Sequence, residues 1–192
     1  MAKKYEFKPD KPISGIWSKL FLTQRQRRSL LKWGLYALLL LVLSVLQDVL
    51  LCRFRLFGAT TELVPCGIFM ICLLEGMDNG SVFSLCAACI YLFSGSAAGY
   101  YSIVFITALS VGIIYFRQSY LQKSFPAAMI CVSAAMILYE LAVFFIGLFL
   151  GMTTFDRIST HFLTALLSLI VAPVLYPISH AISNIGGQAW KE

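Results

Sequence analysis

Two carboxylates of this chain stand inside long apolar stretches, where a charge is costly. Glu140 lies near the middle of one stretch, and Asp48 lies near the end of another. A carboxylate at the centre of a bilayer costs several kcal/mol unless it is neutral, paired or hydrated, so such a residue is a candidate functional site. The alternative for Glu140 is a protonated acid bonded to another helix. Asp48 can instead reach the interface and meet Arg53 or Arg55.

Other polar side chains offer weaker chemistry. The amide of Gln47 can bond to a neighbouring helix. His161 and His180 stand at opposite ends of the last apolar stretch, so they cannot share a metal, and we expect both at the interface. Cys86 and Cys89 form a CxxC pair, which lacks the second ligand pair of a zinc site. With no phosphate-binding loop, HExxH or GxSxG pattern, we expect a protein that binds other molecules, without enzymatic activity, metal or other cofactor.

Six hydrophobic stretches must position these residues. Hydrophobic residues are 59% of the chain and charged residues 12%, a balance typical of membrane proteins. A segment that crosses the bilayer core forms a helix, because no water is there to bond its backbone, and about 20 apolar residues are needed to span the thickness of the core. We therefore predict an all-α integral membrane protein, a six-transmembrane-helix bundle. The spans are expected at about 33–51, 63–74, 81–93, 101–116, 126–150 and 161–176, the last ending at Pro173 and Pro177.

The distribution of Lys and Arg predicts the orientation. Nine of the fifteen precede Trp33, and with six spans both termini lie on the same side. The inward set is completed by Arg117, Lys123 and Lys191, whereas Arg53, Arg55 and Arg157 face outward. The positive-inside rule then places both termini, including the tail 183–192, in the cytoplasm. We read the basic charge as a topology and lipid signal and expect no nucleic-acid partner.

Residues 1–32 form the predicted basic leader. Its apolar residues recur at the spacing of one helical face over 13–21, at Ile13, Ile16, Trp17, Leu20 and Phe21. This pattern predicts a short amphipathic helix that lies on anionic lipids of the inner leaflet. The alternative is a disordered basic tail that serves only to set the orientation.

Small residues and a proline mark the joints between spans. Pro65 stands near the start of the second stretch, and Gly80 opens the third after a polar turn over 75–80. Gly95 and Gly99 bound a small-residue joint that allows either a loop or close helix contact. The candidate partner-contact or intramembrane polar residues are Gln47, Asp48, Pro65, Gly80, Gly95, Gly99 and Glu140.

Several of these residues together resemble a known family. The matching positions are Leu46-Gln47, Glu62-Leu63-Val64-Pro65, Gly80, the stretch Gly95 to Gly99, and Glu140. They resemble the rod shape-determining protein MreD family over about residues 33–182. The chain departs from the family pattern at Ser84, where a second glycine is expected, and it has no acid between Ser81 and Tyr100.

The resemblance implies a non-enzymatic scaffold in the bacterial cytoplasmic membrane, within the machinery for rod shape and lateral peptidoglycan synthesis. The direct partner would be an MreC-like bitopic protein, with indirect links to MreB filaments, RodA and a class B transpeptidase. The implied fold is similar to the substrate-binding subunits of energy-coupling-factor transporters, which supplies the alternative function of binding a vitamin or metal. We favour the scaffold because the first stretch offers one alanine, Ala37, and a broad leucine face in place of the small-residue docking surface of such subunits.

Overall fold

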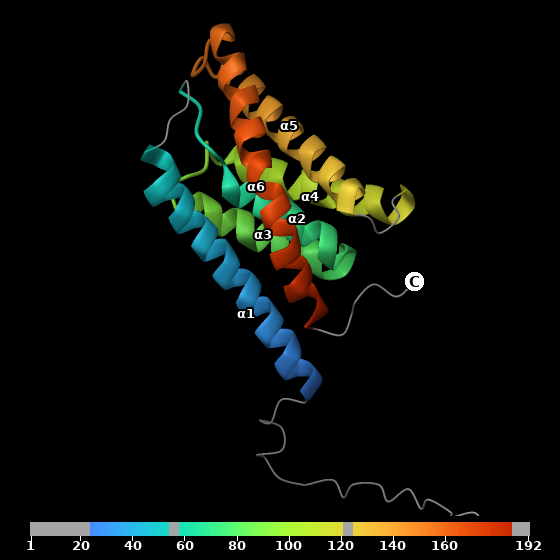
Figure 1. Cartoon of the computed structure of the whole chain (residues 1–192). Helices are drawn as coiled ribbons and strands as arrows, with labels where there is room; N and C mark the ends of the chain where they lie inside the picture. The colour runs from blue at the N-terminus through green and yellow to red at the C-terminus, as the bar shows by residue number, and fades with distance from the viewer. Residues whose placement is uncertain (1–23, 54–57, 121–124, 186–192) are drawn as a thin grey trace, which may run out of the picture.

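The computed structural model describes residues 24–53, 58–120 and 125–185 (Figure 1). Over these ranges the structure is all-α. The long helices are α1 (Gln24–Val45), α2 (Leu63–Glu75), α3 (Met77–Phe93), α4 (Tyr101–Tyr120), α5 (Phe125–Phe149) and α6 (Ile158–Asn184). The short ones are a π-helical turn η2 (Leu46–Leu50), followed by the 3-10 turns η3 (Leu51–Arg53) and η4 (Phe155–Arg157).

Four helical stretches of the described chain are long and apolar enough to cross a membrane. They are Arg27–Val49, Tyr101–Ser119, Phe125–Phe149 and Phe155–Asn184. Helices α2 and α3 have 13 and 17 residues, which makes them about 20 and 26 Å long against a hydrocarbon core of about 30 Å. A membrane protein is therefore supported, whereas the count of six spans and the orientation of the termini stay predictions.

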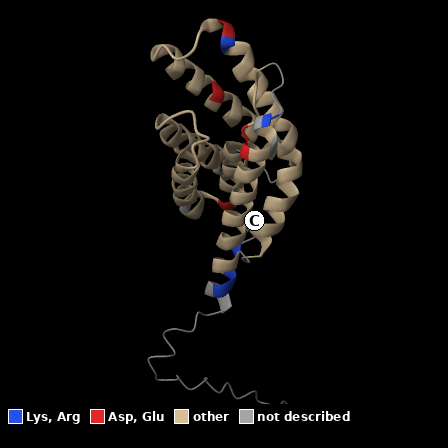
Figure 2. Cartoon of the chain, turned by 90° about the vertical axis from the view of Figure 1, so that its left-hand side faces the viewer, with Lys and Arg blue, Asp and Glu red and all other residues tan. Residues whose placement is uncertain are grey.

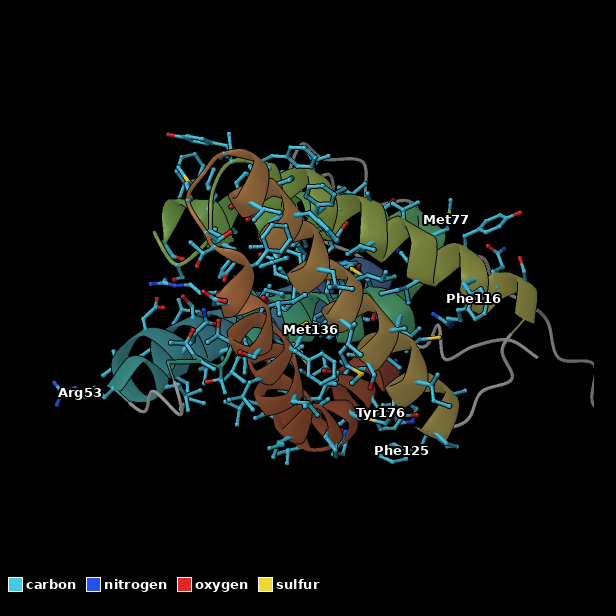
Figure 3. The ribbon with its side chains drawn as sticks, turned by 90° about the horizontal axis from the view of Figure 1, so that it is seen from above. Arg53, Met77, Phe116, Phe125, Met136 and Tyr176 are labelled. Carbon is cyan, nitrogen blue, oxygen red and sulfur yellow. The ribbon has the colours of Figure 1, made fainter. Side chains whose placement is uncertain are left out.

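Helix α2 is the centre of the bundle. Every residue from Leu63 to Leu74 is buried, and the helix packs against α1, α3, α4, α5 and α6. This stretch carries no charged, amide or hydroxyl side chain, so it can be enclosed on all sides without leaving a polar group unpaired. Viewed from above, Met136 of α5 lies in the interior, whereas Arg53 and Phe125 lie at the periphery (Figure 3).

The outer faces of the bundle are apolar and nearly free of charge. Basic residues gather at the free end of α1, and charged side chains are sparse along the long helices (Figure 2). Large apolar residues are exposed on several helices, including Leu41 at 62% and Ile170 at 70%. Such faces are stable against lipid tails, which are as apolar as the side chains themselves.

Several helix boundaries differ from the sequence predictions, and α4 runs on to Tyr120, where an end at 116 was predicted. Helix α3 begins at Met77, so Gly80 lies within the helix. The predicted polar turn is reduced to Gly76, whose φ of 87° favours glycine. Helix α6 continues through Pro173 and Pro177 to Asn184, because neighbouring groups in a membrane bundle can satisfy the carbonyls that a proline frees. Residues 24–32, expected in the leader, belong to α1. The segment 13–21 lies outside the described residues.

Candidate functional site

The two ends of α2 lie inside the protein. The first four N–H groups and the last four C=O groups of any α-helix lack intrahelical partners. Because α2 is shorter than the hydrocarbon core is thick, these groups must find partners among the surrounding helices. Polar side chains are therefore expected at both ends of α2, and the structure shows a cluster at each.

At its N-terminal end, α2 is capped by Gln47, which lies in η2, the turn that continues α1. Its Oε1 accepts hydrogen bonds from the backbone N–H groups of Leu63 at 2.8 Å and Val64 at 3.1 Å. The N–H of Glu62 donates to Ser168 Oγ of α6 at 2.8 Å. The Gln47 side chain is 7% exposed. Its two hydrogen bonds to α2 confirm the predicted bond from this amide to a neighbouring helix. The π-helical turn that carries Gln47 is a rare form that often marks functional positions.

Asp48 joins the same turn to the small-residue joint between α3 and α4. Its Oδ1 accepts a hydrogen bond from Ser96 Oγ at 2.8 Å, and Tyr91 Oη donates to the Ser96 carbonyl at 3.3 Å. The expected ion pair between Asp48 and Arg53 is absent among the described residues, and Arg55 lies outside them. Asp48 is exposed, so this contact sits at the surface.

At the C-terminal end, α2 is held by basic residues of α1 and α4. Lys32 Nζ lies 2.6 Å from Glu75 Oε2, with both side chains almost fully buried. Tyr36 Oη donates to Glu75 Oε1 at 2.6 Å, and Arg117 donates to the carbonyl of Leu73. Cations at a helix C-terminus are favoured by the helix dipole. Sequence reasoning missed this cluster because it placed Lys32 in a cytoplasmic leader and Glu75 in a polar turn.

Glu140 is paired with His161 across the α5–α6 hairpin. Glu140 Oε2 lies 2.9 Å from His161 Nδ1, and the Glu140 side chain is 3% exposed. The alternative for Glu140 was a protonated acid bonded to another helix, and the structure shows the bond, whereas the protonation stays a prediction. His161 was expected at the interface. A signal for the pair exists in the sequence. The two residues lie at nearly equal distances on either side of Gly151, so antiparallel helices joined there bring them to one level.

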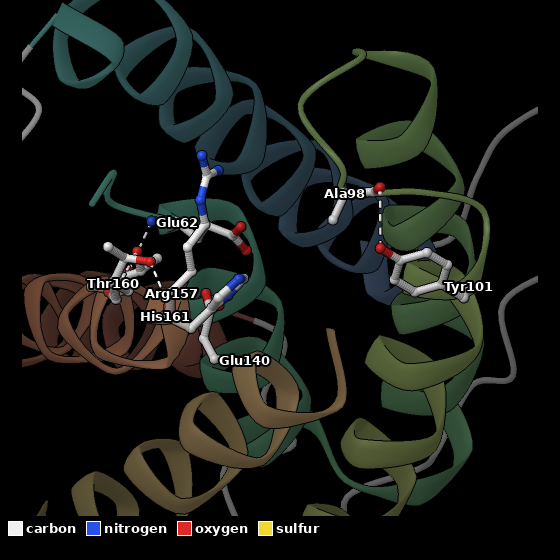
Figure 4. A network of polar contacts seen from close by, with 9 residues as sticks. Glu62, Ala98, Tyr101, Glu140, Arg157, Thr160 and His161 are labelled. Atoms are coloured by element: carbon white, nitrogen blue, oxygen red, sulfur yellow. Dashed lines mark hydrogen bonds and ion pairs between the residues drawn. The ribbon is translucent and has the colours of Figure 1, made fainter. Parts of the chain in front are cut away.

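Glu62 brings a second carboxylate to this region (Figure 4). Burial raises the pKa of the Glu62 carboxyl well above its ordinary value, and the neighbouring Glu140 raises it further. One oxygen of each carboxyl, Glu62 Oε2 and Glu140 Oε1, is buried without a hydrogen-bond partner. Arg157 lies at the exposed edge of the group and forms no ion pair with either carboxyl in the described part of the chain. The arrangement can accept hydrogen bonds or hold a positive charge.

The candidate residues separate into two groups. Gln47, Pro65, Gly80 and Glu140 are buried and act within the bundle. A Cβ at Gly80 would lie 3.2 Å from a backbone oxygen of α2, so this glycine permits the close approach of α3.

The remaining three candidates lie at the surface. Asp48 and Gly95 are exposed, and Gly99 is partly exposed. Gly95 has a φ of 79°, which favours glycine and makes the joint a turn between α3 and α4. These three residues alone among the candidates can contact another molecule directly.

Among the residues that the structure describes, no three His, Cys, Asp or Glu side chains gather as a metal site. Cys86 is exposed and Cys89 partly exposed, both as free thiols. No family model, curated protein or solved structure matches the chain.

Proposed function

We propose that this chain is a non-enzymatic scaffold of the bacterial cytoplasmic membrane, part of the machinery for rod shape and lateral wall synthesis. The proposal starts from the resemblance to the MreD family. Two of the residues that carry that resemblance act on the same helix in this chain, since Gln47 caps α2 and Gly80 lets α3 approach it. A central helix held at both ends favours a rigid body whose surface is available for contacts.

The observation that carries the proposal is one exposed patch formed by two separate candidate segments. The Ser96-to-Asp48 hydrogen bond, 2.8 Å long, joins the end of α1 to the joint between α3 and α4. We call the group of Asp48, Gly95, Ser96 and Gly99 the joint patch. On the expected topology it lies at the outer end of α1, and it offers one carboxylate, one hydroxyl and small residues, which allow close approach of another chain.

The partner proposed for the joint patch is an MreC-like bitopic membrane protein. Links to MreB filaments, RodA and a class B transpeptidase would then be indirect, and anionic lipids would contact the basic leader. These partners follow from the family resemblance. The exposure of Asp48 and Gly95 supports the joint patch as the place of the first contact.

Affinity purification from native membranes in mild detergent, with mass spectrometry of the co-purified proteins, tests this role. The wild-type chain should recover an MreC-like protein with wall-synthesis enzymes. Asp48→Arg should lose that partner because it reverses the charge of the joint patch, whereas Asp156→Arg, the same change on an exposed carboxylate of η4, should retain it. Recovery of two ATPases with a coupling subunit would instead establish the transporter alternative and overturn the scaffold role.

A further inference from the structure

Glu62 stands at the point where the segment 58–62 enters the bundle, directly before α2. Its backbone N–H donates to Ser168 Oγ at 2.8 Å, which ties the segment to α6. The residue as a whole is half-buried, so part of it meets solvent. Its carboxyl oxygen Oε2, in contrast, is buried and accepts no hydrogen bond. The side chain therefore carries an ionisable group from the protein surface into the interior.

The groups around this carboxyl give it no cation of its own. Glu140 of α5 is a second carboxyl beside it, and the imidazole of His161 is already bonded to Glu140 at 2.9 Å (Figure 4). Arg157 interacts with His161 but is exposed, and in the described part of the chain Glu62 forms no ion pair. The other titratable groups that face Glu62 are the phenol groups of Tyr91 in α3, Tyr101 in α4 and Tyr139 in α5.

The protonated form of Glu62 suits this place better than the charged form. A carboxylate whose inner oxygen is buried without a hydrogen bond loses its hydration there, and the neighbouring carboxyl of Glu140 repels it. Both effects raise the pKa of the Glu62 carboxyl well above its ordinary value. A deprotonated Glu62 is therefore more stable in water, on the side where Arg157 is exposed.

The backbone of the segment 58–62 permits this movement. Gly58 is exposed and has a φ of 82°, a left-handed conformation that favours glycine. Residues 60–62 belong to no helix or strand. The hydrogen bond from the Glu62 N–H to Ser168 would have to break. A single neutral hydrogen bond contributes little net free energy, so loss of the proton can outweigh it.

We propose that Glu62 is a proton-controlled latch. With its carboxyl protonated, the segment 58–62 lies against α6 and beside the Glu140–His161 pair. Loss of the proton to water releases the segment, and the carboxylate of Glu62 moves outward toward Arg157. On the expected topology this end of α2 faces the outside of the membrane, so the latch responds to the pH there. The latch goes beyond the scaffold role and does not depend on it.

Hydrogen exchange at single backbone amides of the purified full-length chain, in lauryl maltoside, tests the latch. The Glu62 N–H reports opening, and its protection factor corrects for the base-catalysed exchange of an unfolded peptide. In the open form the carboxyl titrates near its ordinary pKa of about 4.3. Between this value and the pKa of the closed form, the open form binds fewer protons, so the protection should fall about tenfold per pH unit. The amides of Ile68 and Met70, inside α2, should keep their protection.

Three variants assign this pH dependence to Glu62. Glu62→Gln removes the proton-binding group and should make the protection of amide 62 independent of pH. Glu140→Gln keeps the carboxyl of Glu62 but removes the neighbouring charge, so the fall in protection should end at a lower pH than in the wild type. Asp156→Asn, the same change on an exposed carboxylate of η4, should behave as the wild type.

Infrared spectroscopy follows the proton itself. The carboxylic acid C=O stretch of Glu62 should keep its full height over the pH range in which protection falls, and it should be missing in Glu62→Gln. The proposal is overturned if the wild-type protection at Glu62 does not change with pH, or if Ile68 and Met70 lose protection equally, which would mean that the whole bundle unfolds. It is also overturned if Glu140→Gln and the wild type lose protection over the same pH range, a comparison that does not require Glu62→Gln to fold.

Discussion

Replacing Gln47 with methionine should destabilise the bundle by releasing the N-terminus of α2. Methionine has nearly the length of glutamine and is apolar, so it fills the space but accepts no strong hydrogen bond. The N–H groups of Leu63 and Val64, now bonded at 2.8 and 3.1 Å, would be left buried. Each unpaired buried donor costs about 1–3 kcal/mol, and partial rearrangement lowers the sum. We expect a loss of about 2–4 kcal/mol in the free energy of unfolding.

The assay is equilibrium unfolding in mixed micelles, with sodium dodecyl sulfate as the denaturant and helical circular dichroism as the signal. Asp48→Asn is the control, since it changes the next residue, which is exposed, and should shift stability by about 0.5 kcal/mol or less. Amide hydrogen exchange at Leu63 and Val64 should also accelerate in Gln47→Met. If Gln47→Met is no less stable than Asp48→Asn and these amides keep their protection, Gln47 does not cap α2.

Three further predictions concern the rest of the polar framework, each measured by the same unfolding assay. Lys32→Met and Glu75→Gln should each lower the free energy of unfolding by about 3 kcal/mol, because either substitution leaves a buried charge unpaired. If the two single variants are as stable as the wild type, this reasoning is wrong. Gly80→Val should cost about 1–3 kcal/mol by forcing α3 from the α2 backbone, whereas Gly112→Val, with open space around its Cα, should cost less; a reversed order would refute the packing argument. The raised pKa of Glu62 means that its contribution to stability is complete below its unfolded pKa of about 4.3 and is lost as the pH rises through the folded pKa. Glu62→Gln should therefore flatten the decline of stability with pH, and an unchanged slope would show that another group titrates.

The membrane character and the approximate helix positions were predictable from the sequence. Apolar runs of spanning length are a local property, because a helix that crosses the hydrocarbon core bonds nearly all of its backbone groups within itself. The two short stretches were also recognised as too short for straight spans. The start of α3 and the end of α6 were predicted less accurately, since Gly80 and the two prolines of α6 disfavour helix in water but are accommodated here by neighbouring helices.

The pairing of polar residues depended on tertiary structure. Sequence position suggested that Gln47 bonds to another helix, but not that its partners are the free N–H groups of α2. Lys32 and Glu75 meet because α2 ends within the bundle, beside α1. Glu140 and His161 meet because α5 and α6 pack antiparallel, an arrangement that the positions of the two residues in the sequence do not reveal by themselves.

Hydropathy alone therefore determined that this chain is a helical membrane protein, since burial in lipid acts on each helix separately. It could not determine which stretch is surrounded by the others. The central position belongs to α2, because α2 is the shortest of the six long helices and has no charged, amide or hydroxyl side chain over residues 63–74. Once α2 is central, its buried ends require partners, and this requirement brings Gln47, Lys32 and Glu75 to their places.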